Sequence, residues 1–191
     1  MKESLNLAVK LFLITALSAL LLAVSNAYTA PVISARMQME YKNALKGVLP
    51  EADKFNKLDK SKFSKIKEIS SNIEDVAIGE KNGENIGYAI KVAGKNAYKG
   101  EIIFLVGISK KDKKILGYEV LNSKETAGLG SRIGEEPFIK SVLGKSVKKH
   151  FEYKNNPTGE NEVLALSGST VSVKAIINGL NGVVDIIDSI K

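Results

Sequence analysis

An uncharged run near the N-terminus constrains this chain most strongly. Residues 11–35 carry no charge between Lys10 and Arg36, and LFLITALSALLLAV within them is almost purely apolar. A run of about 20 such residues is long enough to cross a bilayer as a helix. The sequence therefore predicts one transmembrane anchor at residues 11–31, in contact with membrane lipid.

Two interpretations of this run both export the rest of the chain. An uncleaved anchor in the cytoplasmic membrane leaves residues 1–10 in the cytoplasm and residues 32–191 as one extracytoplasmic domain. The alternative is a cleaved signal peptide, because Ser25-Asn26-Ala27 resembles a small-x-small cleavage site. The flanking basic residues are balanced, so the positive-inside rule decides little. The length of the run favours the anchor.

Composition excludes several kinds of site. The chain has no cysteine, which rules out disulfides, Cys-bound zinc and Cys-ligated iron–sulfur clusters. Its one histidine, His150, is expected on a surface strand and leaves little for metal binding or acid–base catalysis. The net charge is +7, from 28 basic and 21 acidic residues, but no nucleic-acid motif accompanies it. We expect no metal and no nucleic-acid partner.

The middle of the chain has the pattern of an antiparallel meander. Asn82-Gly83 is a dipeptide favoured in type I′ hairpin turns. GEIIFLVGIS and ILGYEVLNS indicate two later strands joined by the polar turn KKDKK. The residues after Gly83 alternate onto one apolar face: Ile86, Tyr88, Ile90 and Val92.

Helical patterns flank the meander. One covers residues 37–48 and ends before Pro50, and a short one begins at Glu136-Pro137. KSVKKHFEY is interpreted as one more strand, and residues 56–71 give no clear signal. The C-terminal helix carries one apolar stripe: Val173, Ile176, Ile177, Leu180, Val183, Val184 and Ile187. The predicted fold class is α+β: an antiparallel sheet with flanking helices, after one N-terminal transmembrane helix.

The segment SGST at residues 167–170 opens the C-terminal helix. Serine and threonine are common N-cap residues, so an ordinary cap is one interpretation. The same position favours a phosphate, because free amides and the helix dipole attract negative charge. Gly168 allows close approach of the backbone, and Lys174 supplies a countercharge one turn later.

A second motif, ETAGLG, follows the last strand of the meander. Its glycines, including Gly128, are consistent with a loop that needs positive φ angles. Glu125 and Thr126 stand where a backbone and hydroxyl rim could border a flat ligand. Neither this motif nor SGST specifies a ligand by itself.

The two motifs in this order, about 40 residues apart and behind an anchor, resemble the FMN-binding domain family, and most closely the G subunits of Rnf electron-transport complexes. ALKGVLPEA and YKGEIIFLVGI also match that family, as do ETAGLG (usually ETPGLG) and SGST-V-S (usually SGAT-x-S). The chain departs from the usual pattern with Ser169 for alanine, Ala127 for proline and Leu164 for aspartate.

The resemblance implies a covalent cofactor. It implies that a flavin transferase using FAD attaches FMN to Thr170 through a phosphoester, with Ser167, Gly168 and Ser169 completing the motif. It also places Glu125, Thr126, Gly128 and Leu129 beside the isoalloxazine ring.

The expected function is that of an electron-transfer subunit rather than a stand-alone enzyme. By resemblance, the complex passes electrons between ferredoxin and NAD and couples this to ion translocation, with membrane, iron–sulfur and flavin subunits as partners. Two alternatives stay open from the sequence: the C subunit of Na⁺-translocating NADH:quinone reductase, and a non-redox membrane-tethered binding module in which SGST is only a cap.

Overall fold

The computed structural model describes residues 2–190, and these fall into two compact units that divide after Tyr41. The first unit holds most of helix α1, Lys2–Val48, which contains the whole uncharged run and Pro31. By length and composition α1 is a candidate transmembrane span. Helix α1 ends at Val48, just before Pro50, as predicted.

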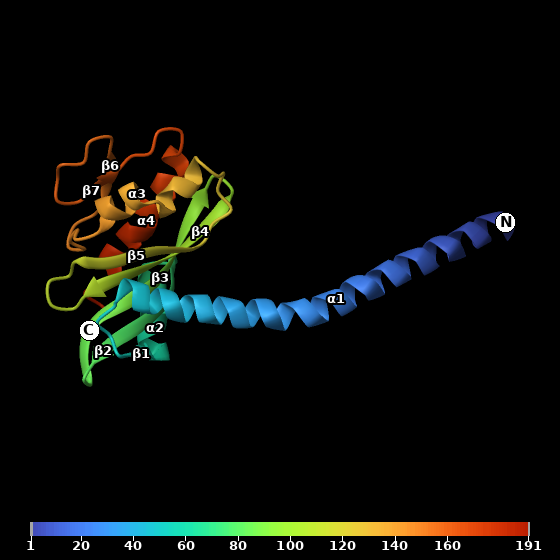
Figure 1. Ribbon diagram of the computed structural model, residues 1–191, viewed down its shortest axis with the longest axis horizontal. Coiled ribbons are helices and arrows are strands. Elements are labelled where there is room, and N and C mark those ends of the chain that lie inside the picture. Colours follow the sequence, from blue (N-terminus) through green and yellow to red (C-terminus); the bar gives the residue numbers. More distant parts are fainter. Residues whose placement is uncertain (1, 191) are drawn as a thin grey trace. The chain divides into compact units, whose positions relative to one another are not determined.

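The second unit is built on a five-stranded sheet in the order β1-β2-β3-β4-β5, and every neighbouring pair is antiparallel (Figure 1). Asn82 and Gly83 have φ angles of 53° and 83°, as a type I′ turn requires. The predicted α+β class and its meander are confirmed. The strands are β1 Lys54–Lys57, β2 Ile73–Lys81, β3 Glu84–Ala97, β4 Gly100–Ser109 and β5 Ile115–Asn122.

Helix α4, Thr170–Ile186, packs on one face of the sheet. At Gly179 the helix comes so close that an added Cβ would lie 2.8 Å from the ring of Phe104. The opposite face is covered by the end of α1, where Val48 packs against Gly107 and Gly117. Helix α4 and the end of α1 thus cover opposite faces of the sheet.

Two elements form across the start and middle of residues 54–71, most of which carry no clear sequence signal. Strand β1 extends the sheet, and helix α2, Lys60–Ile69, follows it. Asp59 caps α2, because its side chain accepts a hydrogen bond from the Ser61 amide at 2.9 Å. Ile66 is fully buried and attaches this lysine-rich helix to the core.

The segment from 145 to 153 differs from its prediction as one strand. Only Glu152–Lys154 forms a strand, β6, which pairs in parallel with β7, Glu162–Leu164, outside the main sheet. His150 is exposed as expected but lies before the strand. Its neighbours Val147 and Phe151 are both buried, but Lys149, which would share their face in a strand, is exposed, because residues 147–149 form a turn and a bend. Helix η1, Gly130–Gly134, and helix α3, Glu136–Val142, precede this segment.

Candidate functional site

The SGST segment forms the turn into α4. Gly168 has a φ of +77°, a conformation that favours glycine. The Ser169 amide donates to the Leu166 carbonyl at 3.0 Å, and α4 begins at Thr170. Thr170 and Ser167 are both exposed. The hydroxyl of Thr170 therefore stands at the open first turn of a 17-residue helix.

No side chain among residues 2–190 caps this helix. Ser169 occupies the N-cap position, but its side chain makes no capping hydrogen bond. Ser169 is buried, and its hydroxyl has no partner within the described chain. The first amides of a helix have no acceptor within the helix. The interpretation of SGST as an ordinary side-chain cap is wrong, and the exposed helix start is left with donors for an anion.

The ETAGLG loop is ordered by its own backbone. The Leu129 and Ser131 amides donate to the Thr126 carbonyl at 3.1 Å and 3.2 Å. Gly128 has a φ of +73°, and its amide donates to the Ser131 hydroxyl at 3.0 Å. The loop thus presents Leu129, which is 47% exposed, at its tip.

Glu125 joins this loop to helix α4. One carboxylate oxygen accepts a hydrogen bond from the hydroxyl of Ser172, which lies in the first turn of α4. The other accepts from the Lys99 amide, in the turn between β3 and β4, at 2.7 Å. Gly130 lies against this pair, since an added Cβ there would be 2.7 Å from the Ser172 hydroxyl oxygen. Both carboxylate oxygens of Glu125 therefore accept hydrogen bonds from the protein itself. A contact of Glu125 with flavin stays a prediction.

The two motifs also meet through an apolar contact. A Cβ at Gly168 would lie 3.4 Å from a methyl group of Leu129. Val171, directly after Thr170, is 46% exposed, and Tyr98, directly before Lys99, is 72% exposed. Exposed apolar side chains thus come from each segment that Glu125 ties together.

The structure brings together the predicted residues of both motifs. It adds Ser172, Lys99, Tyr98 and Val171, which sequence reasoning did not select. A serine two residues after Thr170 was visible in the SGST-V-S match, whereas a backbone amide such as that of Lys99 leaves no sequence signal. Lys174 is exposed one turn into α4, and among the described residues it has no ion pair.

The loop before β7 is held by one carboxylate. Glu162 pairs with Lys154 and accepts from the Thr158 and Gly159 amides at 2.9 Å and 2.8 Å. The Lys154 ammonium and then these amides lower the pKa of Glu162 to about 2. This loop leads into the strand that delivers SGST.

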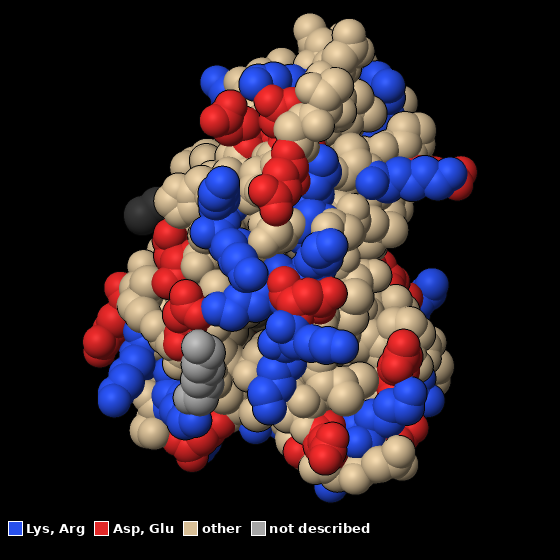
Figure 2. All heavy atoms as spheres, turned by 90° about the vertical axis from the view of Figure 1, so that its left-hand side faces the viewer, with Lys and Arg blue, Asp and Glu red and all other residues tan. Residues whose placement is uncertain are grey.

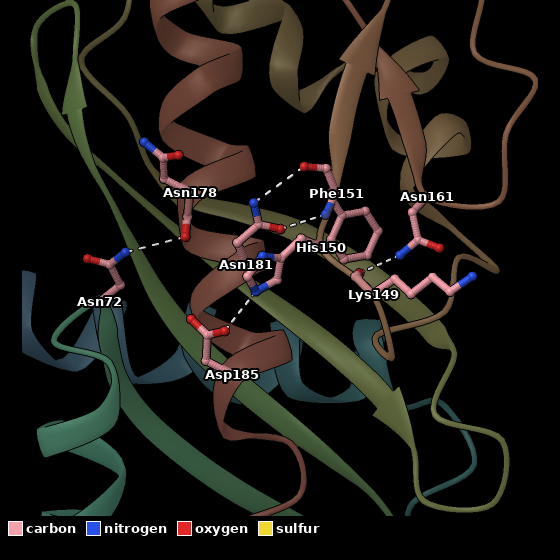
Figure 3. Close-up of polar contacts among 8 residues, drawn as sticks. All are labelled: Asn72, Lys149, His150, Phe151, Asn161, Asn178, Asn181 and Asp185. Carbon is pink, nitrogen blue, oxygen red and sulfur yellow. Dashed lines mark hydrogen bonds and ion pairs between the residues drawn. The ribbon is translucent and has the colours of Figure 1, made fainter.

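A second polar cluster lies near the C-terminal end of α4 (Figure 3). His150 Nε2 is 2.7 Å from Asp185 Oδ1, and the Asn181 side chain bonds both the amide and the carbonyl of Phe151. These bonds fasten the segment before β6 to α4. Across residues 2–190 no group of three or more His, Cys, Asp or Glu side chains forms a metal site.

Known proteins are similar to this chain across the region of both motifs and over most of its length. Residues 97–185 match the FMN-binding domain family, a range that contains both motifs. The chain is 34% identical to the G subunit of the Na⁺-translocating ferredoxin:NAD⁺ oxidoreductase complex of Acetobacterium woodii, over 92% of this chain and 87% of that protein. It is 28% identical to the G subunit of the ion-translocating oxidoreductase complex of Methanosarcina acetivorans, over 98% and 96%.

Solved structures share the fold at lower identity. NqrC of Shewanella oneidensis has a TM-score of 0.52 and 19% identity, over 61% of this chain and 58% of that one. The C subunit of the Na⁺-translocating NADH-quinone reductase of Parabacteroides distasonis gives 0.52 and 19%, over 61% and 62%. The alignment thus spans less than two thirds of each of these two proteins, whereas the G subunits match almost end to end. The chain belongs to the family of G subunits of Rnf-type ion-translocating oxidoreductase complexes.

Proposed function

We propose that this protein is the membrane-anchored flavoprotein subunit of an Rnf-type ferredoxin:NAD oxidoreductase complex, with FMN bound covalently to Thr170. The observation that carries the proposal is the exposed Thr170 hydroxyl, at an uncapped helix start and beside the ETAGLG loop, within a matched FMN-binding domain.

The start of α4 suits the phosphate group. The free amides of the first turn and the positive end of the helix dipole favour negative charge at Thr170. Gly168 has no side chain that would keep a phosphate away, and the Lys174 ammonium lies one turn further along the helix. A phosphoester at Thr170 places the phosphate in reach of all three.

The apolar rim suits the ring system. Leu129 and Val171 flank the threonine, and Tyr98 adds an exposed aromatic side chain near the turn that binds Glu125. Bound FMN supplies the electron-carrying chemistry, while the protein supplies position and electrostatics. Thr126, Gly128 and Leu129 form the loop backbone that would border the ring, and Glu125 keeps that loop against α4.

Attachment requires a flavin transferase acting on FAD. The Thr170 oxygen would form a bond to the phosphorus of the FMN half while the diphosphate bond to AMP breaks, and the hydroxyl proton passes to a base of the transferase. Thr170 is exposed, so an external enzyme can reach it. A covalent ester also keeps the cofactor on a domain that is exported.

The anchor places this flavoprotein at the membrane. We assign residues 11–31 to the membrane, residues 1–10 to the cytoplasm and residues 32–191 to the extracytoplasmic side, in a single-pass arrangement. The uncharged run and its length within α1 support this. Other subunits of the complex are the expected partners.

The test is co-expression of the full chain with its flavin transferase, followed by denaturing electrophoresis. Wild type should give a yellow-fluorescent band, Thr170→Ala should give none, and Thr158→Ala, a control at an exposed threonine outside both motifs, should keep fluorescence. A colourless wild type would instead support a non-redox binding module. Flavin that is released by denaturation would disprove the covalent bond but not FMN binding.

A further inference from the structure

Two lysine-rich segments lie side by side at the end of the sheet away from the ETAGLG loop. They are the turn between β4 and β5, residues 110–114, and residues 145–150. The Val147 amide donates to the Lys113 carbonyl at 2.9 Å, and the Ile115 amide donates to the Lys145 carbonyl at 2.9 Å. These bonds fix the two segments as one surface, which we call the basic surface.

Most of the lysines on the basic surface form no ion pair among the described residues. Lys113 pairs with Asp188, but the other exposed lysines have no ion pair within the described chain. The only carboxylate within the two segments is that of Asp112, which is bonded to the Ser109 hydroxyl. The exposed lysines without an ion pair are Lys110, Lys111, Lys114, Lys148 and Lys149.

The basic surface concentrates the excess charge of its unit. Residues 42–191 contain 25 basic and 19 acidic residues, a net charge of +6. The two segments hold seven lysines and one aspartate, a formal net charge of +6, and Asp188 from outside them pairs with Lys113. Figure 2 shows lysine and arginine side chains gathered across the middle of this face, with carboxylates between them. Such a concentration of charge attracts an anionic partner and speeds its association.

Two exposed leucines adjoin the lysines. The Gly144 amide donates to the Ile115 carbonyl at 2.8 Å, so the neighbours Leu143 and Leu116 lie close to the same junction. These leucines are 37% and 49% exposed. An apolar centre bordered by polar side chains is the arrangement found at protein–protein interfaces.

We propose that the basic surface, with Leu116 and Leu143, is the docking surface for an acidic protein surface on another subunit of the complex. The inference rests on the proposed function, which supplies the complex. A protein fits better than a lipid bilayer, because Asp112, Asp185 and Asp188 lie among the lysines. An anionic bilayer surface would repel these three carboxylates. A partner can place its own cations opposite them.

Docking there leaves the flavin site open. Asp185 contacts His150 near the end of α4, whereas Thr170 begins the same helix. The 17 residues of this α-helix separate these ends by about 25 Å. Partner docking and flavin attachment are therefore separable by mutation.

The experiment compares charge reversals in the full chain, co-expressed with the other subunits of the complex and the transferase. One variant carries Lys110→Glu, Lys111→Glu, Lys148→Glu and Lys149→Glu. The matched control reverses four exposed lysines of β1 and α2: Lys57→Glu, Lys60→Glu, Lys65→Glu and Lys67→Glu. The readouts are the subunits recovered per tagged chain, at several salt concentrations, and the covalent flavin per chain.

The expected result is about tenfold lower recovery of the partner subunits with the basic-surface variant, and wild-type recovery with the control. Wild-type recovery should fall as salt rises. Covalent flavin should be equal in all three, which also reports an intact fold. A fourfold Lys→Gln variant at the same positions should show an intermediate loss.

Three results would overturn the proposal. The first is recovery of the partner subunits at the wild-type level with the basic-surface variant. The second is an equal loss of recovery with the basic-surface variant and the control. The third is a loss of recovery that occurs in membranes with anionic lipid but not in zwitterionic nanodiscs. The last would assign the surface to lipid headgroups. If no chain carried covalent flavin, but the basic-surface variant still recovered fewer partner subunits than wild type and the control, the proposed cofactor bond would be refuted and this inference would stand.

Discussion

Ser172→Ala removes the hydroxyl that ties α4 to the ETAGLG loop. Ser172 is 2% exposed, and its hydroxyl donates to a carboxylate oxygen of Glu125. A hydrogen bond to a charged group contributes about 1.5–3 kcal/mol, and its loss leaves the acceptor unsatisfied. We expect the free energy of unfolding to fall by that amount, and the covalent flavin per chain to fall with it, because the two motifs would no longer be held together.

The assay is guanidinium unfolding of the full chain in mild detergent, with tyrosine fluorescence as the signal that reports unfolding. Ser64→Ala is the control: its hydroxyl bonds the Lys60 carbonyl at 3.0 Å on an exposed helix, so we expect a change within about 0.5 kcal/mol. The double variant of Ser172→Ala and Glu125→Gln should lose less stability than the two single losses added together, because the two side chains share one bond. A Ser172→Ala protein as stable as the Ser64→Ala control would refute the role of this bond.

Three further predictions concern the loop, the acid range and the anchor. Gly128→Val should lower flavin incorporation, because a φ of +73° costs a valine about 1–3 kcal/mol although no atom lies within 4 Å of the added Cβ; normal incorporation with an unchanged flavin spectrum would contradict this. The pKa of Glu162 is lowered from 4.5 to about 2, so its stabilising effect is present above pH 4.5 and is lost as the pH falls toward 2. The difference in melting temperature between wild type and Glu162→Gln should shrink over that range, and a constant difference would disprove the assignment. N-terminal sequencing of the mature protein should find residues 11–30 retained, whereas a start at Tyr28 or Pro31 would show a cleaved signal.

The parts of the fold that were predictable from sequence are those with local signals. Asn82-Gly83 fixes a hairpin by backbone preference, and the apolar stripe of the last helix defines the face that packs on the sheet. The helix at Lys60–Ile69 had one such signal, an aspartate at the N-cap position Asp59, but its many lysines obscured the apolar face that carries Ile66. The prediction of a strand around His150 was wrong, because the chain turns at residues 147–149 and buries Val147 and Phe151 without forming a strand there.

The site was predictable only in part. SGST and ETAGLG are visible as motifs, but nothing in their local chemistry requires them to meet. Their link through Glu125 and Ser172 spans 47 residues, and the third member is the Lys99 backbone amide, which any residue but proline could supply. The buried and unpaired hydroxyl of Ser169 likewise depends on tertiary packing, since the sequence alone favours that serine as a cap.

The intact mass of the full chain, produced with the flavin transferase, tests the covalent bond at Thr170 most directly. Wild type should be heavier than the unmodified chain by one FMN less one water, and fragmentation should place the addition on Thr170. Thr170→Ala should have the mass of its unmodified chain while its fold is kept, since Thr170 is exposed and makes no side-chain hydrogen bond within the described chain. A Thr170→Ala protein that still carries the FMN mass after denaturation would contradict the account.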